Sequence, residues 1–336
     1  MSVGSLRVAV VFGGDSAERG VSIASALQII PALRSRGHCV MAVDLRDGPI
    51  GDELQQRSLK EGSAGYELAV HEHGSSHLNS AQLLDWIGEA DVTFLALHGG
   101  VGENGAVQTI LELGGKAYTG SGPLGSCIAM DKDVSKRLYQ QAGIPTANWR
   151  MVERGKSNWR AVEKYPVVVK PNRQGSTIGL SLVREPGQLE GALELAFRFD
   201  DEAMIEDFIL GRELTVGILD GQPLAVGEVL VTHDAIFDFE TKYLPGAVKE
   251  QFPAEIDQEL AERLRDYSLR AHCALKLKGY SRTDFRVTDD GAIFCLETNT
   301  LPGMTATSLL PQSALAAGIP FDELCERICL MAIRPR

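Results

Sequence analysis

Two strand-like segments near the C-terminal end of the chain carry side chains that could bind a metal ion. The segments cover residues 281–287 and 292–299, and Asp290-Gly291 lies between them. An Asp-Gly pair between two such segments is a strong short-range signal for a β-hairpin. The sequence therefore predicts an antiparallel hairpin with a two-residue loop.

This loop length determines which side chains face each other. Asp284 would pair with Glu297, and Arg282 with Asn299. Because side chains alternate between the two faces of a strand, all four would lie on one face. Facing carboxylates repel unless a cation lies between them. Their oxygen ligands suit Mg²⁺, which commonly completes its shell with nucleotide phosphates and water, and Arg282 could stabilise developing negative charge.

A second interpretation of this hairpin face is a solvated surface on which Arg282 neutralises the carboxylates. A shift of one residue in the loop would also separate Asp284 from Glu297. The residues alone leave both interpretations open.

Two further segments could hold anionic groups with their backbone. Residues 170–179 (KPNRQGSTIG) follow a run of valines and offer flexible amides, hydroxyl groups and two cations, as a phosphate-covering loop does; an ordinary hairpin turn explains them equally well. Residues 300–308 (TLPGMTATS) could bind an oxyanion or carboxylate through their amides, or begin a helix capped by Thr or Ser.

The elements that position these segments alternate in the first part of the chain. Apolar runs at 7–12, 39–45 and 92–97 predict buried strands, and 16–33 and 106–113 predict helices. This alternation over roughly the first 120 residues is typical of a doubly wound α/β lobe.

Beyond this lobe the expected elements change. A helix is predicted over 131–142, and strands over 167–170 and 203–206. After residue 213, strand and hairpin patterns dominate until a final helix over 321–332.

Length and charge limit the function classes. A chain of 336 residues favours two or three lobes. The net charge of −12 argues against a general nucleic-acid surface. Neither a signal sequence nor an apolar stretch of membrane-spanning length is present, so we expect a cytoplasmic protein with no membrane contact.

Six motifs occur in the order typical of one enzyme family. They are residues 13–19 (GGDSAER), 97–105 (LHGGVGENG), 130–132 (MDK), 170–176 (KPNRQGS), 240–243 (ETKY) and 297–305 (ETNTLPGMT). Together they resemble the D-alanine–D-alanine ligase family, whose members have the ATP-grasp fold. The matches extend over nearly the whole chain.

The resemblance implies a three-lobed α/β protein. The lobes would be an N-terminal substrate lobe (1–120), a central ATP-grasp lobe (121–206) and a C-terminal ATP-grasp and catalytic lobe (207–336), with ATP between the last two. A homodimer is also implied.

The resemblance further implies a set of ligands for ATP and metal. The predicted nucleotide-binding residues are Lys132, Lys170, Glu206, Asp207, Phe208, Ile209, Glu213 and Lys242. Lys132 and Lys170 would contact phosphates, residues 206–209 would hold adenine, and Glu213 would contact ribose. Asp284, Glu297 and Asn299 match the family's ligands for Mg²⁺, with two ions expected and Mn²⁺ as an alternative metal.

The implied reaction joins two D-alanines through an acyl phosphate and releases ADP and phosphate, for peptidoglycan precursor synthesis. The predicted catalytic residues are Glu18, Ser176, Tyr243, Arg282 and Gly303, of which the first three match a hydrogen-bonded triad. The predicted substrate-binding residues are Glu18, His98, Ser308 and Leu309. Two alternatives are a ligase with another amino-acid or hydroxy-acid acceptor and a nucleotide-binding regulatory protein.

The sequence departs from the family pattern at two places. Gly20 stands where the family usually has Glu, and Phe237 and Phe239 lack the usual aromatic hydroxyl groups. Both departures leave the identity of the acceptor less determined than the class of reaction.

Overall fold

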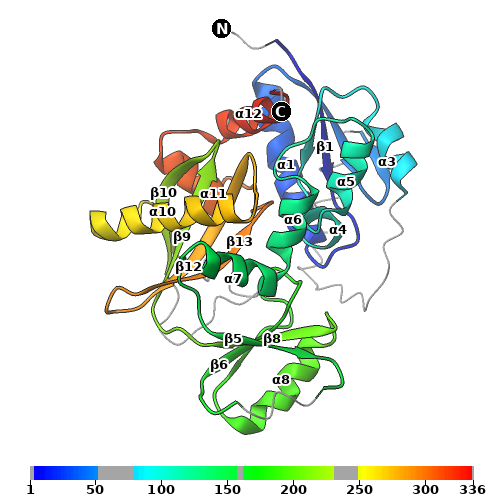
Figure 1. The fold of residues 1–336 in the computed structure, drawn as a ribbon. Helices are drawn as coiled ribbons and strands as arrows, with labels where there is room; N and C mark the ends of the chain where they lie inside the picture. The colour runs from blue at the N-terminus through cyan, green and yellow to red at the C-terminus, as the bar shows by residue number, and fades with distance from the viewer. Residues whose placement is uncertain (1–3, 52–78, 157–161, 231–248, 335–336) are drawn as a thin grey trace.

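The computed structural model describes residues 4–51, 79–156, 162–230 and 249–334. Within these ranges the chain forms three β-sheets with helices packed against them (Figure 1). The predicted Lys242 and Tyr243, and the departures at Phe237 and Phe239, lie outside the described residues.

The N-terminal sheet has the strand order β3-β2-β1-β4. β1 (Arg7–Phe12), β2 (Cys39–Asp44) and β4 (Val92–Leu95) run parallel, and the short β3 (Gly48–Ile50) pairs antiparallel with β2 at the edge. Helices cover the sheet, so β1 and β4 are buried on both faces and consist of continuous apolar runs. The predicted α/β alternation is confirmed.

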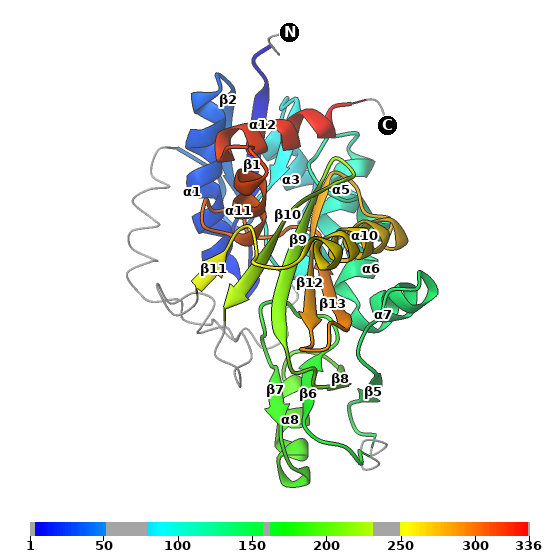
Figure 2. The same ribbon diagram turned by 90° about the vertical axis from the view of Figure 1, so that its left-hand side faces the viewer.

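The helices of this region are α1 (Arg19–Ser35), α3 (Ser80–Ile87), α4 (Gly100–Glu103), α5 (Ala106–Leu113) and, from the far end of the chain, α12 (Phe321–Ala332). Figures 1 and 2 both show α12 lying beside α1. Its buried side chains join the core formed by β1, β4 and α1. The two ends of the chain therefore share one hydrophobic core.

The central sheet is antiparallel, in the order β5-β8-β6-β7. Its strands are β5 (Trp149–Glu153), β8 (Glu202–Asp207), β6 (Val167–Pro171) and β7 (Ser181–Val183). The 3₁₀ turn η2 (Pro186–Gln188) leads into α8 (Leu189–Ala196), which packs its apolar face on the sheet. β6 and β8 are the strands that present side chains to the site described below.

The C-terminal sheet has the order β11-β10-β9-β12-β13 and is also antiparallel. Its strands are β9 (Arg212–Leu219), β10 (Gln222–Leu230), β11 (Lys249–Gln251), β12 (Tyr280–Val287) and β13 (Ile293–Asn299). The helices α6 (Pro123–Met130), α7 (Lys132–Gln141), α10 (Gln258–Ala274) and α11 (Leu309–Ala316) contact it.

The expectation that strands dominate between residue 213 and the last helix is wrong for two segments, α10 and α11. α10 begins at an N-cap, Asp257, whose side chain accepts a hydrogen bond from the Leu260 amide. It buries Leu264, Ser268 and Ala271 against the sheet, and this spacing of three and four is that of a helix face.

The predicted hairpin between β12 and β13 is confirmed, but its two-residue loop is wrong. Next to the turn, Val287 pairs with Ile293, and the Thr288 amide donates to the Ala292 carbonyl. The loop therefore has three residues, 289–291, instead of two. A β-bulge then occurs at Leu296, because Phe285 pairs with Cys295 while Asp284 pairs with Glu297. The extra loop residue is on the β12 side of the hairpin and the extra bulge residue is on β13, so their effects on the pairing cancel. Asp284 therefore faces Glu297, and Arg282 faces Asn299, as predicted.

Candidate active site

A cleft of about 850 Å³, including its open mouth, lies between the central and C-terminal sheets. The predicted site residues that line it are Lys132, Lys170, Glu206, Asp207, Phe208, Ile209, Glu213, Asp284 and Glu297. Apolar side chains from both sheets complete its walls, among them Val168, Ile178 and Leu296. The cleft thus combines apolar walls with several charged groups of both signs.

Lysines on one side of the cleft meet a buried carboxylate. The Lys170 ammonium lies 2.6 Å from Glu206 Oε2, and the Lys136 ammonium donates to the other oxygen. Burial raises the pKa of Glu206, but the two ammonium groups outweigh this effect and lower it. Glu206 therefore remains charged and holds Lys170 at the cleft wall. Lys136, which the sequence did not single out, is almost fully buried and hence has a lowered pKa.

The facing carboxylates of the hairpin lie at the opposite wall. Arg282 donates from Nε and Nη2 to the two oxygens of Asp284 at 2.9 and 2.8 Å, and Thr215 Oγ1 donates at 2.7 Å. Asn299 Nδ2 lies 3.1 Å from Asp284 Oδ2. Asp284 is buried, and both carboxylates line the cleft. The solvated-surface interpretation of this hairpin face is therefore wrong, although Arg282 does neutralise Asp284 as that interpretation required.

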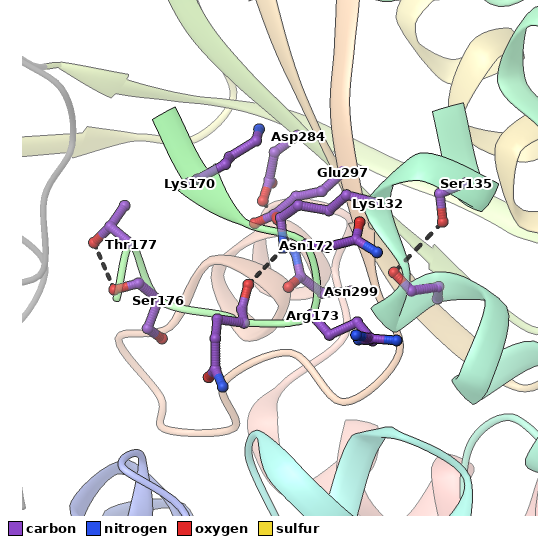
Figure 3. A network of polar contacts seen from close by, with 12 residues as sticks. Lys132, Ser135, Lys170, Asn172, Arg173, Ser176, Thr177, Asp284, Glu297 and Asn299 are labelled. Atoms are coloured by element: carbon purple, nitrogen blue, oxygen red, sulfur yellow. Dashed lines mark hydrogen bonds and ion pairs between the residues drawn. The ribbon is translucent and has the colours of Figure 1, made fainter. Parts of the chain in front are cut away.

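Lys132 connects the two walls. Its ammonium lies 3.5 Å from Glu297 Oε2 and 2.5 Å from the carbonyl oxygen of Gln174. Figure 3 shows Lys132 beside Glu297 and Asp284, next to the loop that carries Asn172. Burial lowers the pKa of Lys132, although the nearby carboxylate of Glu297 acts in the other direction.

The segment that follows β6 both connects two strands and lines the cleft. β6 and β7 are paired, so this segment is a hairpin connection, as one interpretation held. Gln174, Gly175 and Thr177 nevertheless face the cleft, as expected for a loop that covers phosphates. Ser176 and Thr177 have φ values of +49° and +59°, a conformation that L side chains rarely adopt. Such strain is frequent at binding sites.

Glu18 approaches this segment from the N-terminal region. Its carboxylate accepts a hydrogen bond from Ser176 Oγ, so two members of the predicted triad are in contact. Two glycines leave room for it: a Cβ on Gly99 would lie 2.6 Å from Glu18 Oε2, and a Cβ on Gly175 would lie 3.0 Å from it. A larger residue at either position would displace the carboxylate.

His98 is buried and makes two hydrogen bonds. Nδ1 lies 3.0 Å from the carbonyl oxygen of Leu301, and Nε2 lies 3.0 Å from Ser25 Oγ. A carbonyl only accepts, so Nδ1 carries the proton and Nε2 accepts from the Ser25 hydroxyl. Burial, aided by the nearby charge of Arg282, lowers the pKa of His98 to about 4, although the bond to Leu301 acts in the other direction. The imidazole is therefore neutral near pH 7.

Glu103 is a second, partly buried carboxylate near Glu18, and the sequence assigned it no role. Its oxygens accept hydrogen bonds from the Gly99 and Leu301 amides at 2.7 and 3.2 Å. Burial and the charge of Glu18 raise the pKa of Glu103 to about 8. Its position within the motif 97–105 was the only sequence signal for it.

Gly303, Ser308 and Leu309 lie where the chain leaves β13. A Cβ on Gly303 would lie 2.9 Å from Ser308 Oγ, so the two residues are neighbours. Ser308 is the N-cap residue of α11, which begins at Leu309, so a helix start does occur here. Ser308 Oγ accepts from the Thr305 amide instead of capping the helix. Gly20 is exposed in the first turn of α1.

The arrangement of three sheets, with a cleft lined by lysines and carboxylates between two of them, is that of the ATP-grasp fold. Its sequence matches the family models "D-ala D-ala ligase N-terminus" over residues 7–121 and "D-ala D-ala ligase C-terminus" over residues 138–330. The chain belongs to the D-alanine–D-alanine ligase family.

Individual relatives agree with this assignment. The chain is 43% identical to a D-alanine–D-alanine ligase of Geobacter sulfurreducens, over 97% of this chain and 94% of that protein. It is 38% identical to a D-alanine–D-alanine ligase of Pediococcus pentosaceus, over 97% of this chain and 97% of that protein. A crystal structure of the D-alanine–D-alanine ligase from Bacillus anthracis, complexed with ATP, is similar with a TM-score of 0.76 and 32% identity over 98% of both chains.

Among the residues that the structure describes, no helix is both long and apolar enough to cross a membrane.

Proposed function

We propose that this protein joins two D-alanine molecules with the energy of ATP and releases D-alanyl-D-alanine, ADP and phosphate, as a step in making peptidoglycan precursors. Membership of the family supports this reaction. The structural observation that carries the proposal is the cleft in which Lys132 and Lys170 lie opposite the paired carboxylates Asp284 and Glu297.

The residues of the cleft fit ATP. Lys132 and Lys170 supply positive charge for its phosphates, and the segment 206–209 with Glu213 forms the wall for adenine and ribose. The segment 174–177 closes over the phosphates. Lys242 is assigned to the same group by the family motif.

The donor set at the hairpin fits a hard divalent cation. Asp284, Glu297 and Asn299 offer oxygen ligands, which suit Mg²⁺ or Mn²⁺. Within the described ranges, no three His, Cys, Asp or Glu side chains form a complete metal site. Phosphate oxygens and water would therefore supply the remaining ligands, and two ions would share them. Such ions would neutralise the charge of the transferring phosphoryl group.

The reaction begins when a carboxylate oxygen of the first D-alanine attacks the γ-phosphorus of ATP. The bond between this phosphorus and the β,γ-bridging oxygen breaks, and ADP leaves. Glu18 binds the ammonium of this D-alanine, and His98 lies beside it as a neutral hydrogen-bonding group. Ser176 closes the site through its bond to Glu18. The family motif assigns Tyr243 to the same triad.

In the second step, the amine of the second D-alanine attacks the acyl carbon. The carbon–oxygen bond to phosphate breaks, and the departing phosphate takes up the proton that the amine loses. Arg282 and the Gly303 amide stabilise the oxyanion of the tetrahedral intermediate. Ser308 and the Leu309 amide, at the start of α11, bind the carboxylate of the second D-alanine.

The surroundings of the reaction follow from its substrates. We place the enzyme in the cytoplasm, where ATP is available, and we propose a homodimer. The lobes would divide the chain at residues 120/121 and 206/207.

The reaction is tested by incubating the protein with ATP, Mg²⁺ and D-alanine and measuring phosphate and dipeptide. Equal amounts of the two products are expected. Folded protein that binds nucleotide but forms no dipeptide would contradict the proposal. D-lactate and other amino acids, offered in competition, test whether Gly20 and the two phenylalanines change the acceptor.

A further inference from the structure

The loop between β13 and α11 is held in place by side chains from the N-terminal region. This loop, residues 300–306, carries Gly303. At its beginning, the Leu301 amide donates to Glu103 Oε1 at 3.2 Å, and the Leu301 carbonyl accepts from His98 Nδ1 at 3.0 Å. Both polar groups of the Leu301 backbone are therefore bonded by residues that follow β4: His98 in the connection to α4, and Glu103 at the end of α4.

Beyond Gly303, helix α1 holds the other half of the loop. The Met304 amide donates to Ser25 Oγ at 3.3 Å, and the Ala306 amide donates to Gln28 Oε1 at 2.6 Å. Ser25 and Gln28 are three residues apart and so lie on one face of the helix. Ser25 also donates to His98 Nε2, which joins the two halves into one network.

These contacts enclose Gly303 on both sides along the chain. An amide that stabilises an oxyanion must point at the place where charge develops before the charge appears, because reorientation during the reaction costs free energy. Glycine itself restricts the backbone least. The direction of the Gly303 amide must therefore be set by what holds its neighbours.

We propose that Ser25, Gln28 and Glu103 are positioning residues, which orient the Gly303 amide through the loop 300–306. The N-terminal region would then do more than bind the first substrate: it would also complete an oxyanion site that is built on the C-terminal part of the chain. This inference rests on the proposed function, because it concerns the step in which the tetrahedral intermediate forms.

Ser25→Ala is the main test. It removes the acceptor of the Met304 amide and the donor to His98, while the ATP cleft is unchanged. We expect kcat for dipeptide formation to fall at least tenfold, as small displacements of catalytic groups do. The KM for ATP should remain within about twofold, because Lys132, Lys170 and Glu206 make no contact with this network.

Ser22→Ala is the matched control. Ser22 lies one turn earlier on α1, is equally buried, accepts from the Gly13 amide at 2.7 Å and donates to the Ala96 carbonyl at 2.6 Å. Its loss also removes two hydrogen bonds from a buried hydroxyl, so the stability cost should be similar, but neither bond reaches the loop. Its kcat should remain within about twofold of wild type. Ser25→Thr, which keeps the hydroxyl group, should recover most of the activity lost in Ser25→Ala.

Equal losses of kcat in Ser22→Ala and Ser25→Ala would overturn the proposal, since they would indicate general loosening of α1. Unchanged kcat in Ser25→Ala would overturn it as well. Titration with ATP confirms that each variant is folded. If Ser25→Ala does not fold, Gln28→Ala and Glu103→Gln replace it. Each should lower kcat at least tenfold and leave the KM for ATP within about twofold. If the proposed function itself is wrong, the wild-type protein will form no dipeptide. If only the positioning role is wrong, the wild-type protein will form dipeptide and the variants will not behave as expected.

Discussion

At the scale of single residues, the site consists of charged groups whose burial makes each dependent on a partner. Glu206 remains charged because two lysines contact it, and the buried carboxylate of Asp284 is hydrogen-bonded by Arg282 and Thr215. Glu297 lines the cleft beside Asp284, and its carboxylate lies 3.5 Å from the Lys132 ammonium.

Glu297→Gln should lower turnover at limiting Mg²⁺ by at least tenfold, because an amide is a weaker ligand than a carboxylate for a hard cation. The change preserves size, so high Mg²⁺ should restore part of the activity. The measurement is initial rate against Mg²⁺ concentration at saturating ATP. Glu153→Gln, at an exposed position of β5, is the control and should match wild type. Wild-type rates for Glu297→Gln at limiting Mg²⁺ would remove Glu297 from the metal site.

His98 should make the protein less stable in acid. Its pKa is about 4 in the folded protein, against an ordinary value of about 6.5 in the unfolded chain. Between these values the unfolded chain binds a proton that the folded chain does not, so stability falls as pH decreases from about 6.5 to about 4. At pH 5 the expected cost is about 2 kcal/mol.

The measurement is the free energy of unfolding in urea at pH 7.5 and pH 5.0, for wild type and His98→Asn. The loss between the two pH values should be about 2 kcal/mol smaller in the variant. His272 is also buried, with a pKa lowered to about 4, and its contribution remains in both proteins. Identical losses would show that His98 does not contribute.

At the scale of elements, patterns with a local cause could be predicted and those set by distant contacts could not. β1 and α12 were predicted at their observed bounds because a continuous apolar run and a helical apolar spacing identify them. α10 is the exception: Asp257 and the spacing of Leu264 and Ala271 are local signals of a helix, yet the segment was not predicted as one.

The same distinction applies to the site. The facing of Asp284 and Glu297 could be predicted from the alternation of side chains along a hairpin, but the bulge at Leu296 has no local signal. Lys136 and Glu103 were not identified because their partners lie far away in the sequence: Glu206 is 70 residues from Lys136, and Leu301 is 198 residues from Glu103. Only the folded chain brings such groups together.

The helix α10 should contribute strongly to the C-terminal sheet. Leu264 is fully buried between α10 and the sheet, so Leu264→Ala should cost about 2–5 kcal/mol through lost contacts and the cavity left behind. Leu315→Ala is the matched control on α11, where the leucine is 61% exposed, and should change stability by less than about 0.5 kcal/mol. Unfolding in urea gives both values. Similar costs for the two variants would show that α10 does not pack as described.

At the scale of the whole molecule, the chain closes on itself. α12 comes from the C-terminal end but packs on α1 and β4, so part of the N-terminal core is supplied by the last helix. The network around Gly303 also links the N-terminal region to the loop after β13. The proposed substrate site beside α1 and the proposed oxyanion site after β13 therefore belong to one continuous structure.

Deletion of α12 should consequently unfold the N-terminal region, although the two are far apart in the sequence. Leu324, Cys325, Ile328 and Cys329 are at most 1% exposed. Burial of a leucine or isoleucine contributes about 1.5–3 kcal/mol, so losing this face would remove a large part of the roughly 5–15 kcal/mol by which a native protein is stable. A chain ending at residue 320 should show fast hydrogen exchange throughout β1 and α1, whereas a chain ending at Ile333 should exchange like the full-length protein. Slow exchange of β1 and α1 in the shorter chain would mean that the N-terminal core is complete without its last helix.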